Sequence, residues 1–315
     1  MTPVKGRAAP RAGTGANFLD PVVLQRIGNL ELVARGVVEG FLQGLHRSPF
    51  LGQSLDFAEH RPYTVGDDPR RVDWRVYART GRYYVKEFEA ETNTDFTLLL
   101  DVSRSMAFGG SGITKFDYAR FLAASLVFFA RRQGDRVGIV TLDDRVRDFV
   151  PCSARHLERV LITIDRARPD GSGHLASALE ALAERQARAG IVALVSDLYL
   201  DPEELSGPLK VLGQAGNDVL VFHVLDPAER ELPYDDALTM EDLETGETLP
   251  LQPGDLRSEY RELVRAHITA VAQALAKGRV DHLLADTSSP LDEVLFGYLS
   301  ARQNRKRRGR WASPS

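Results

Sequence analysis

The sequence predicts an α/β fold, a doubly wound and mostly parallel sheet with helices on both faces. From residue 95 onward, short apolar runs alternate with longer segments that repeat apolar residues at helical spacing. The short runs are continuously apolar, which is typical of parallel strands that are covered on both sides. Strands that alternate with helices in this way indicate crossover connections and a layered α/β domain.

Composition sets limits on the class of protein. The chain has 315 residues, 43% of them hydrophobic and 27% charged, which is ordinary for a globular protein. Its formal charge of -4 argues against a general affinity for nucleic acid. The single cysteine, Cys152, excludes an internal disulfide and a cysteine-based zinc site. With no apolar run long enough to cross a bilayer, we expect a cytoplasmic protein in a reducing compartment.

The N-terminal part is expected to differ from the alternating region. Residues 1–17 have no apolar centre, and we expect a disordered lead there. Residues 18–93 are expected to form a helix and a β-rich extension. The helix is predicted to begin at Asp20 with Pro21 in its first turn, and its apolar face runs from Val23 to Phe41. A polar, turn-rich segment then contains one strand candidate at 82–91.

The alternating domain is expected over residues 94–302. The predicted strands are 96–103, 136–144, 146–152, 190–198, 218–226 and 280–287. The predicted helices are 115–132, 155–167, 174–189, 201–216, 256–277 and 291–302. A hairpin insertion is expected near 232–254, with its turn near Thr245. Residues 303–315 are expected to form a basic disordered tail, which we interpret as solvated because no aromatic stacking platform accompanies its charges.

Polar side chains follow two of the predicted core strands. The run "TLLLDVSRSM" delivers Asp101, Ser103 and Ser105 to one strand end, and "LVSDL" delivers Asp197 to another. Ligands of doubly wound sheets bind beyond the carboxyl ends of the strands. Oxygen ligands suit a hard cation, Mg²⁺ or alternatively Mn²⁺. The competing interpretation is that Asp101 only caps its own loop, as short polar side chains commonly do.

With "DVSRS", a helix opened by Lys115 and the later "SDL", residues 95–226 resemble a von Willebrand factor A domain. The resemblance implies a metal-ion-dependent adhesion site. Ser103 and Ser105 would bind the metal directly, while Asp101 and Asp197 would act mainly through water. An acidic side chain of a protein partner would complete the metal's shell.

The second loop of this site departs from the family pattern. The family has a threonine ligand there, whereas "GSGHLASAL" places Gly173 at that position. Glycine has no ligand atom. Either Ser172 substitutes for the threonine after a small loop shift, or the site is incomplete.

A second signature precedes the domain, in residues 54–93. The order R-x-Y-x-x-G-D-D-x-R-x-x-D-W resembles a bacterial family of unknown function, number fifty-eight, which has von Willebrand A-like domains. The resemblance implies a partnership with MoxR-type AAA+ ATPases in the assembly, maturation or metal loading of other complexes. We expect the segment to dock a partner or to form an internal salt-bridge network. Its candidate residues are Arg61, Tyr63, Asp67, Asp68, Arg70, Asp73 and Trp74.

Three functions remain open from the sequence. The leading hypothesis is a non-catalytic protein-interaction module, because no P-loop, nucleophile elbow or H-E-x-x-H motif is present. The second is a Mg²⁺-dependent phosphoesterase or another hydrolase. Against it, the carboxylates are few, and Asp143 and Asp144 are expected farther from the site. The third is a structural module with a vestigial metal site.

Overall fold

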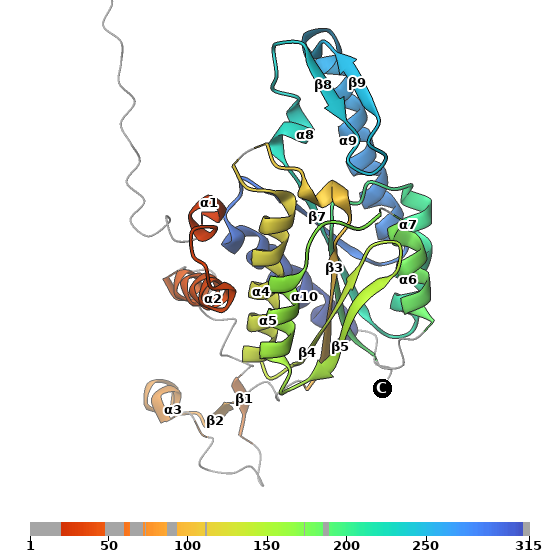
Figure 1. The fold of residues 1–315 in the computed structure, drawn as a ribbon. Helices are drawn as coiled ribbons and strands as arrows, with labels where there is room; N and C mark the ends of the chain where they lie inside the picture. The colour runs from red at the N-terminus through yellow and green to blue at the C-terminus, as the bar shows by residue number, and fades with distance from the viewer. Residues whose placement is uncertain are drawn as a thin grey trace, which may run out of the picture.

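The core of the protein is a six-stranded sheet of order β10-β7-β6-β3-β4-β5 (Figure 1). A computed structural model describes residues 20–47, 60–63, 72, 74–86, 93–110, 112–172, 174–184 and 189–310. The sheet strands are β3 (Asp95–Asp101), β4 (Arg136–Leu142), β5 (Val146–Ser153), β6 (Gly190–Ser196), β7 (Asp218–Leu225) and β10 (Asp281–Asp286). All neighbouring strands run parallel except β4 and β5, which are antiparallel.

Helices cover both faces of the sheet, so the predicted fold class is confirmed. Successive residues of a strand point to opposite faces. Accordingly, Leu98 and Leu100 join one buried cluster and Leu99 joins the other. The first cluster is covered by α2 (Leu30–Arg47), α4 (Lys115–Arg132), α5 (Leu157–Arg166) and α10 (Leu291–Arg310). The second is covered by α6 (Leu175–Ala183), α7 (Pro202–Gln214) and α9 (Pro253–Lys277).

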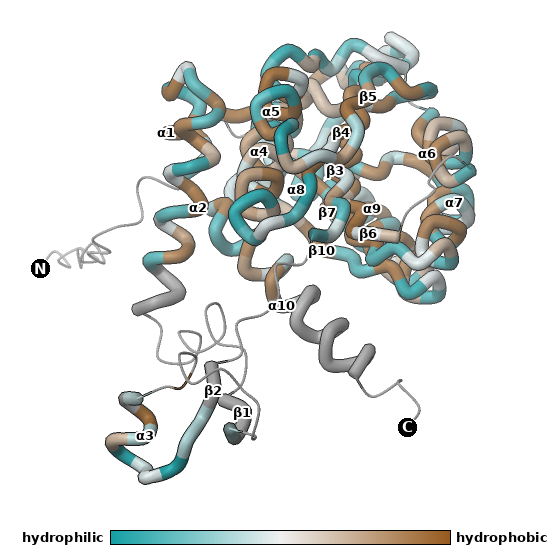
Figure 2. Tube along the Cα trace, turned by 90° about the horizontal axis from the view of Figure 1, so that it is seen from below, coloured by the Kyte–Doolittle hydropathy of each residue, from teal (hydrophilic) through white to brown (hydrophobic). Residues whose placement is uncertain are grey.

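Hydrophobic residues lie along the strands and on the helices beside them, whereas α8 (Pro227–Glu231) is coloured as hydrophilic (Figure 2). The chain order of the strands reverses between β3 and β6, which lie side by side at the centre of the sheet. Loops after such strands part in opposite directions and leave a crevice at the switch point. The "DVSRS" and "SDL" segments are the two loops that follow β3 and β6.

Two helices differ from the prediction. The N-terminal helix is broken into α1 (Pro21–Leu24) and α2, because the Asn29 side chain accepts a hydrogen bond from Leu32 N, 3.0 Å away, and caps a new start. Helix α10 does not end at residue 302 but continues to Arg310, so the expected disordered tail is partly helical. Arginine and lysine are good helix formers, which favours this continuation. The expected lead, 1–17, and residues 311–315 lie outside the described residues.

The segment before the domain is described only in part. Strands β1 (His60–Pro62) and β2 (Tyr84–Lys86) pair antiparallel, and α3 (Trp74–Thr80) lies between them in the chain. Tyr77 and Tyr83 stack with ring centroids 4.4 Å apart, and this contact joins α3 to the start of β2. The remainder of the strand candidate at 82–91 lies outside the described residues.

An antiparallel hairpin follows α8. Its strands are β8 (Leu238–Glu241) and β9 (Thr248–Leu251), within the segment where the sequence predicts an insertion. The hairpin stands beyond the carboxyl edge of the sheet, beside the first part of α9 (Figure 1). None of the helices among the described residues is both long enough and apolar enough to cross a membrane.

Candidate functional site

Asp101 lies at the carboxyl end of β3 with only 2% of its surface exposed. Its Oδ1 accepts a hydrogen bond from Ser103 N at 2.9 Å, and its Oδ2 accepts one from Ser196 Oγ at 2.5 Å. Burial raises the pKa of Asp101 to about 7, and the nearby charge of Asp197 adds to the rise. The carboxyl group therefore organises the first loop from within.

Ser103 and Ser105 follow Asp101 around the start of the short helix η3 (Arg104–Ala107). Ser103 is buried, Ser105 is half-buried, and their Oγ atoms lie 3.0 Å apart. The second loop fixes this arrangement, because Gly171 N donates to Val102 O and Arg104 N donates to Gly171 O, both at 3.0 Å. Two hydroxyls are thus held side by side at the edge of the sheet.

Asp143 lies directly beside this second loop, although we expected it farther away. A Cβ atom added to Gly171 would lie 2.1 Å from Oδ2 of Asp143. Asp143 is fully buried and paired with Arg147, which lowers the pKa of its carboxyl group against the opposing effect of burial. We call the loop that carries Ser103 and Ser105 the serine loop. Glycine at 171 therefore lets the second loop approach both Asp143 and the serine loop closely.

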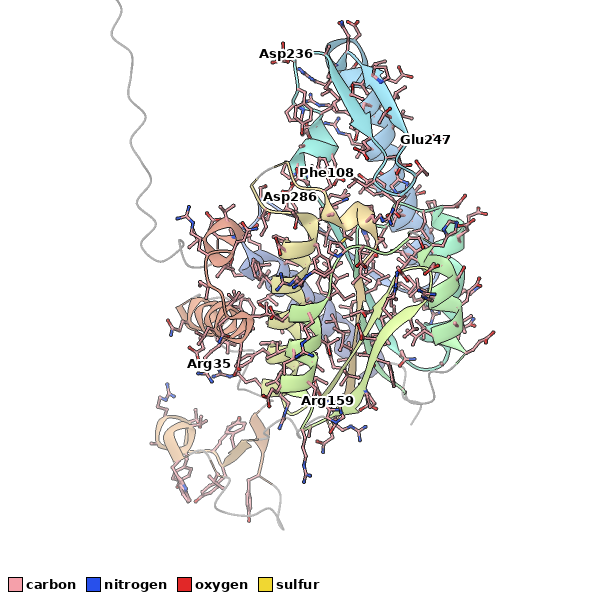
Figure 3. The ribbon with its side chains drawn as sticks, viewed as in Figure 1. Arg35, Phe108, Arg159, Asp236, Glu247 and Asp286 are labelled. Atoms are coloured by element: carbon pink, nitrogen blue, oxygen red, sulfur yellow. The ribbon has the colours of Figure 1, made fainter. Side chains whose placement is uncertain are left out.

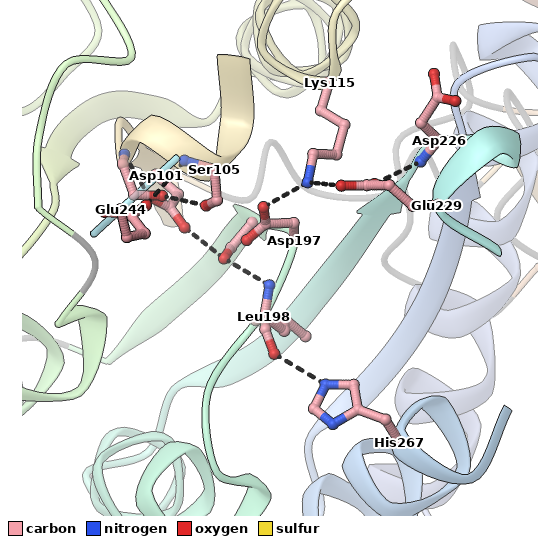
Figure 4. A network of polar contacts seen from close by, with 11 residues as sticks. Asp101, Ser105, Lys115, Asp197, Leu198, Asp226, Glu229, Glu244 and His267 are labelled. Atoms are coloured by element: carbon pink, nitrogen blue, oxygen red, sulfur yellow. Dashed lines mark hydrogen bonds and ion pairs between the residues drawn. The ribbon is translucent and has the colours of Figure 1, made fainter. Parts of the chain in front are cut away.

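Asp197, the first residue after β6, is paired with Lys115 rather than left free (Figure 4). Lys115 Nζ lies 2.7 Å from Asp197 Oδ2 and 2.6 Å from Glu229 Oε1, and the lysine side chain is fully buried. Burial alone would lower the pKa of Lys115, but Asp197 and Glu229 raise it by more. The ammonium group therefore stays charged and neutralises part of the site's negative charge. The Tyr199 ring also faces it, with its centroid 4.8 Å away.

The loop after Asp197 is held in a strained conformation. Leu198 has a φ of 54°, in the left-handed region that a leucine rarely adopts. Its N–H donates to Ser196 Oγ at 3.0 Å, and its carbonyl accepts a hydrogen bond from His267 Nε2 at 3.2 Å. Such strain persists only where surrounding contacts over-determine it, and it commonly marks functional sites.

Glu244, from the turn between β8 and β9, reaches the serine loop. Ser105 N donates to Glu244 Oε1 at 2.8 Å, between residues 139 positions apart in the chain (Figure 4). The second oxygen, Oε2, is buried, and no hydrogen-bond partner for it is found in the described part of the chain. A carboxylate of the protein thus lies against the loop that carries Ser103 and Ser105, the residues that the resemblance implies as direct metal ligands.

Ser172 is exposed and follows Gly171, whose backbone bridges to Ser103. Gly173, which stands at the family's threonine position, lies outside the described residues.

The predicted partner-binding residues are placed only in part. Asp67, Asp68, Arg70 and Asp73 lie outside the described residues. Arg61 belongs to β1. Tyr63 is half-buried, with its ring centroid 6.3 Å from that of Tyr83. Trp74 begins α3 and is 58% exposed. These positions join Tyr63 and Trp74 to one aromatic group around Tyr83, which Trp74 also contacts edge-on.

The oxygen atoms at the sheet edge are of the type that Mg²⁺ takes. Neighbouring ligands in an octahedral Mg²⁺ shell, each about 2.1 Å from the ion, lie roughly 3 Å apart. The Ser103 and Ser105 hydroxyls have this separation. No group of three or more His, Cys, Asp or Glu side chains arranged to hold a metal occurs among the described residues, so a cation here would depend on the hydroxyls.

Sequence reasoning missed several of these residues for identifiable reasons. Ser196 and Lys115 stand in the quoted motifs, but their side-chain contacts are invisible in a linear pattern. Glu229 completes a capping box with Asp226 at the start of α8, and the order "DPAE" is a signal for that helix start. Nothing local marks Glu244, because its contact depends on where the hairpin folds back.

Comparison with known proteins settles the family. The family model described as "Protein of unknown function DUF58" matches residues 59–270. The chain belongs to this family. The resemblance stated from the sequence is therefore confirmed, and the matched range includes most of the second signature and most of the following domain.

DUF58 relatives and solved structures give further similarities. The chain is 31% identical over 263 residues to "Uncharacterized protein Rv1480" of Mycobacterium tuberculosis, covering 81% of this chain and 82% of that protein. An aerotolerance-related membrane protein from Bacteroides fragilis is 15% identical, with a TM-score of 0.45 over 64% of this chain and 96% of that one. The SpRpn10 VWA domain is 13% identical, with a TM-score of 0.40 over 65% of this chain and 94% of that one.

Proposed function

We propose that this DUF58 protein is a non-catalytic interaction module of von Willebrand A type, whose site between the ends of β3 and β6 takes an acidic side chain of a protein partner. One observation carries the proposal. The Ser105 N–H, beside the Ser103 and Ser105 hydroxyls, already binds a carboxylate at 2.8 Å. A carboxylate acceptor strengthens such a hydrogen bond, so this loop is suited to an acidic group.

Mg²⁺, or Mn²⁺ in its place, is part of the proposal. Ser103 and Ser105 would hold the ion directly, with Asp101 and Asp197 acting through water. The ion would supply the positive charge that attracts a partner's carboxylate. Lys115 commits one Asp197 oxygen to an ion pair, and both Asp101 oxygens accept hydrogen bonds, so the two serine hydroxyls would have the larger share in holding the cation.

The partner in this proposal is of the MoxR-type AAA+ class, as the resemblance seen in the sequence implies. In that role the chain would assist the assembly or maturation of a protein complex. The polar segment before β3 supplies a second docking candidate, with Trp74 the exposed aromatic residue among its described members. Exposed tryptophan is enriched at the centres of protein interfaces.

The test is a binding titration of the full chain against the purified MoxR-type ATPase of the same organism, in Mg²⁺ and in chelator. Asp101→Asn and Ser105→Ala are each expected to weaken binding by about tenfold or more. The first variant removes a negative charge beside the proposed cation, and the second removes a hydroxyl that would bind the cation. Asp236→Ala is the control, since this exposed carboxylate lies at the far end of the insertion (Figure 3).

Equal binding in chelator and by both loop variants would remove this site from the interaction. Mg²⁺-dependent hydrolysis of a phosphoester that disappears in Asp101→Asn would replace the proposal by the hydrolase hypothesis. Absence of a Mg²⁺ or Mn²⁺ heat signal in calorimetry of the unmodified chain would favour a structural module with a vestigial site.

A further inference from the structure

We infer that Glu244 is an internal carboxylate that occupies the partner's position, so that an acidic partner binds the serine loop only by displacing the β8–β9 turn. The inference rests on the proposed function and adds how access to the site is controlled. It also specifies the partner's contact as a carboxylate on the Ser105 N–H.

The contact itself is incompletely satisfied. Glu244 Oε1 accepts the Ser105 N–H at 2.8 Å, whereas Oε2 is buried with no hydrogen-bond partner among the described residues. A desolvated carboxylate oxygen without a partner is unfavourable. A competing carboxylate that places both oxygens on donors or on a cation would be better satisfied, and this difference favours exchange.

The turn is built to present Glu244 without help from the site. The Asp242 carboxylate accepts from Glu244 N at 2.8 Å and from the Thr245 hydroxyl at 3.0 Å. Gly246 N donates to Asp242 O at 2.7 Å, and Gly246 has a φ of 74°, which glycine adopts readily. The turn therefore keeps its shape when it leaves the serine loop.

The arm that carries the turn is anchored at its base and exposed along its length. Arg257 of α9 donates to the carbonyls of Leu232 and Tyr234, which precede the hairpin. Leu249 is 64% exposed. Since little apolar surface is buried along the strands, lifting the turn disrupts few packing contacts. Opening is thus a local event that leaves the sheet intact.

Displacement sets the apparent affinity of the site. A ligand that binds only the open state has a dissociation constant increased by the inverse of the open fraction. If the turn is closed in about 90% of molecules or more, removing the Glu244 carboxylate should strengthen the binding of an acidic ligand by at least about tenfold.

The experiment uses the full chain in Mg²⁺ and a labelled synthetic peptide, EDLETGET, which copies residues 241–248. We expect Glu244→Ala to bind this peptide at least about tenfold more tightly than the unmodified chain does. Glu247→Ala should bind it as the unmodified chain does, because Glu247 is an exposed carboxylate of the same hairpin (Figure 3). A peptide with glutamine in place of the central glutamate should bind none of them tightly.

A second measurement needs no ligand. Hydrogen exchange of the Ser105 amide should accelerate in Glu244→Ala and stay unchanged in Glu247→Ala, because only the first variant loses the acceptor. Glu244→Gln keeps an amide oxygen as acceptor, so it should retain the fold and show a smaller increase in both measurements.

The outcomes separate the two proposals. Equal peptide binding and equal Ser105 exchange in all variants would overturn the internal-carboxylate inference, while the ATPase titration could still show dependence on Asp101. If ATPase binding did not depend on Asp101 but Glu244→Ala still bound the peptide more tightly, the site would still bind carboxylates. The proposed ATPase partner would then be wrong.

Discussion

Lys115 connects three segments that are distant in the chain. Its ammonium group, at the first residue of α4, pairs with Asp197 after β6 and with Glu229 in α8. All three side chains are buried or nearly so. In such an arrangement, the free-energy cost of removing each charge from water is offset only while its oppositely charged partners remain. The ion pair with Lys115 therefore positions Asp197, and any change at position 115 should alter the placement of the Asp197 side chain.

We predict that Lys115→Met destabilises the folded chain by about 3 kcal/mol, because two buried carboxylates lose their compensating charge while the packing volume is largely kept. Urea unfolding measures this change. Lys210→Met is the control, since Lys210 is exposed on α7, and it should change the free energy of unfolding by no more than about 0.5 kcal/mol. Similar values for both variants would contradict a structural role for the buried ammonium group.

At the residue scale, the sequence predicted the side chains that belong to contiguous motifs. Asp101, Ser103, Ser105 and Asp197 all lie at the carboxyl ends of β3 and β6, where the strand pattern places them. Glu229, Glu244 and Asp143 were not predicted as part of the site. Asp143 directly follows β4, and its approach to the site depends on Gly171 of the second loop. Glu229 and Glu244 arrive through connections whose paths depend on tertiary packing, and no local signal encodes where such a connection ends.

At the element scale, close approach between loops decides which residues fit. Gly171 pairs with the serine loop on one side and faces Asp143 on the other. Asp143 cannot move aside easily, because it is buried and bound to Arg147. A side chain at 171 would therefore displace either the second loop or the serine loop.

We predict that Gly171→Ala destabilises the protein by about 1–3 kcal/mol, because an added Cβ overlaps the Asp143 side chain. Thermal and urea unfolding measure the change. The matched variant is Gly36→Ala, at an exposed position inside α2 where, apart from chain neighbours and the helix's own backbone, no atom lies within 4 Å of the added Cβ. It should stabilise the chain by about 0.5–1 kcal/mol through helix propensity. Opposite signs for the two variants are the expected result, and a neutral Gly171→Ala would show that the loops can separate freely.

The elements themselves were predictable where periodicity is strong. Every predicted core strand and helix of residues 95–302 has a counterpart, because apolar runs and helical spacing report burial directly. The break between α1 and α2 was missed, since the apolar spacing continues through it while Asn29 caps a new helix. The short elements η3 and α8 were also missed, because a single turn has too few residues to show a period.

At the scale of the whole molecule, the N-terminal helix is part of the domain core. Val37 and Val38 of α2 are fully buried in the same cluster as residues of α4, and the Phe41 ring meets that of Phe129 edge-on, 6.0 Å between centroids. The expected boundary near residue 93 therefore separates segments of sequence, but α2 shares its packing with the sheet domain.

We predict that Val37→Asp lowers the free energy of unfolding by more than about 3 kcal/mol, because it buries a carboxylate without a partner. Leu32→Asp, on the same helix but 57% exposed, should change it by no more than about 0.5 kcal/mol. Urea unfolding followed by circular dichroism distinguishes them. If α2 were an independent appendage, both variants would leave the main unfolding transition unchanged.

The mostly parallel sheet with helices on both faces followed from general rules, whereas the placement of the insertion did not. Right-handed crossovers and short connections leave few ways to order alternating strands and helices. The hairpin obeys no such rule, because its orientation depends on the arginines of α9 and on the Glu244 contact.

The two ends of the hairpin lie next to each other, since Leu238 pairs with Leu251. A replacement for the segment between these two positions would begin and end at neighbouring points. Its length and sequence can therefore change without shifting the register of the sheet. The segment that covers the serine loop can therefore diversify on a constant scaffold. A foreign hairpin grafted between Leu238 and Leu251 would give this domain a different segment controlling access to the serine loop.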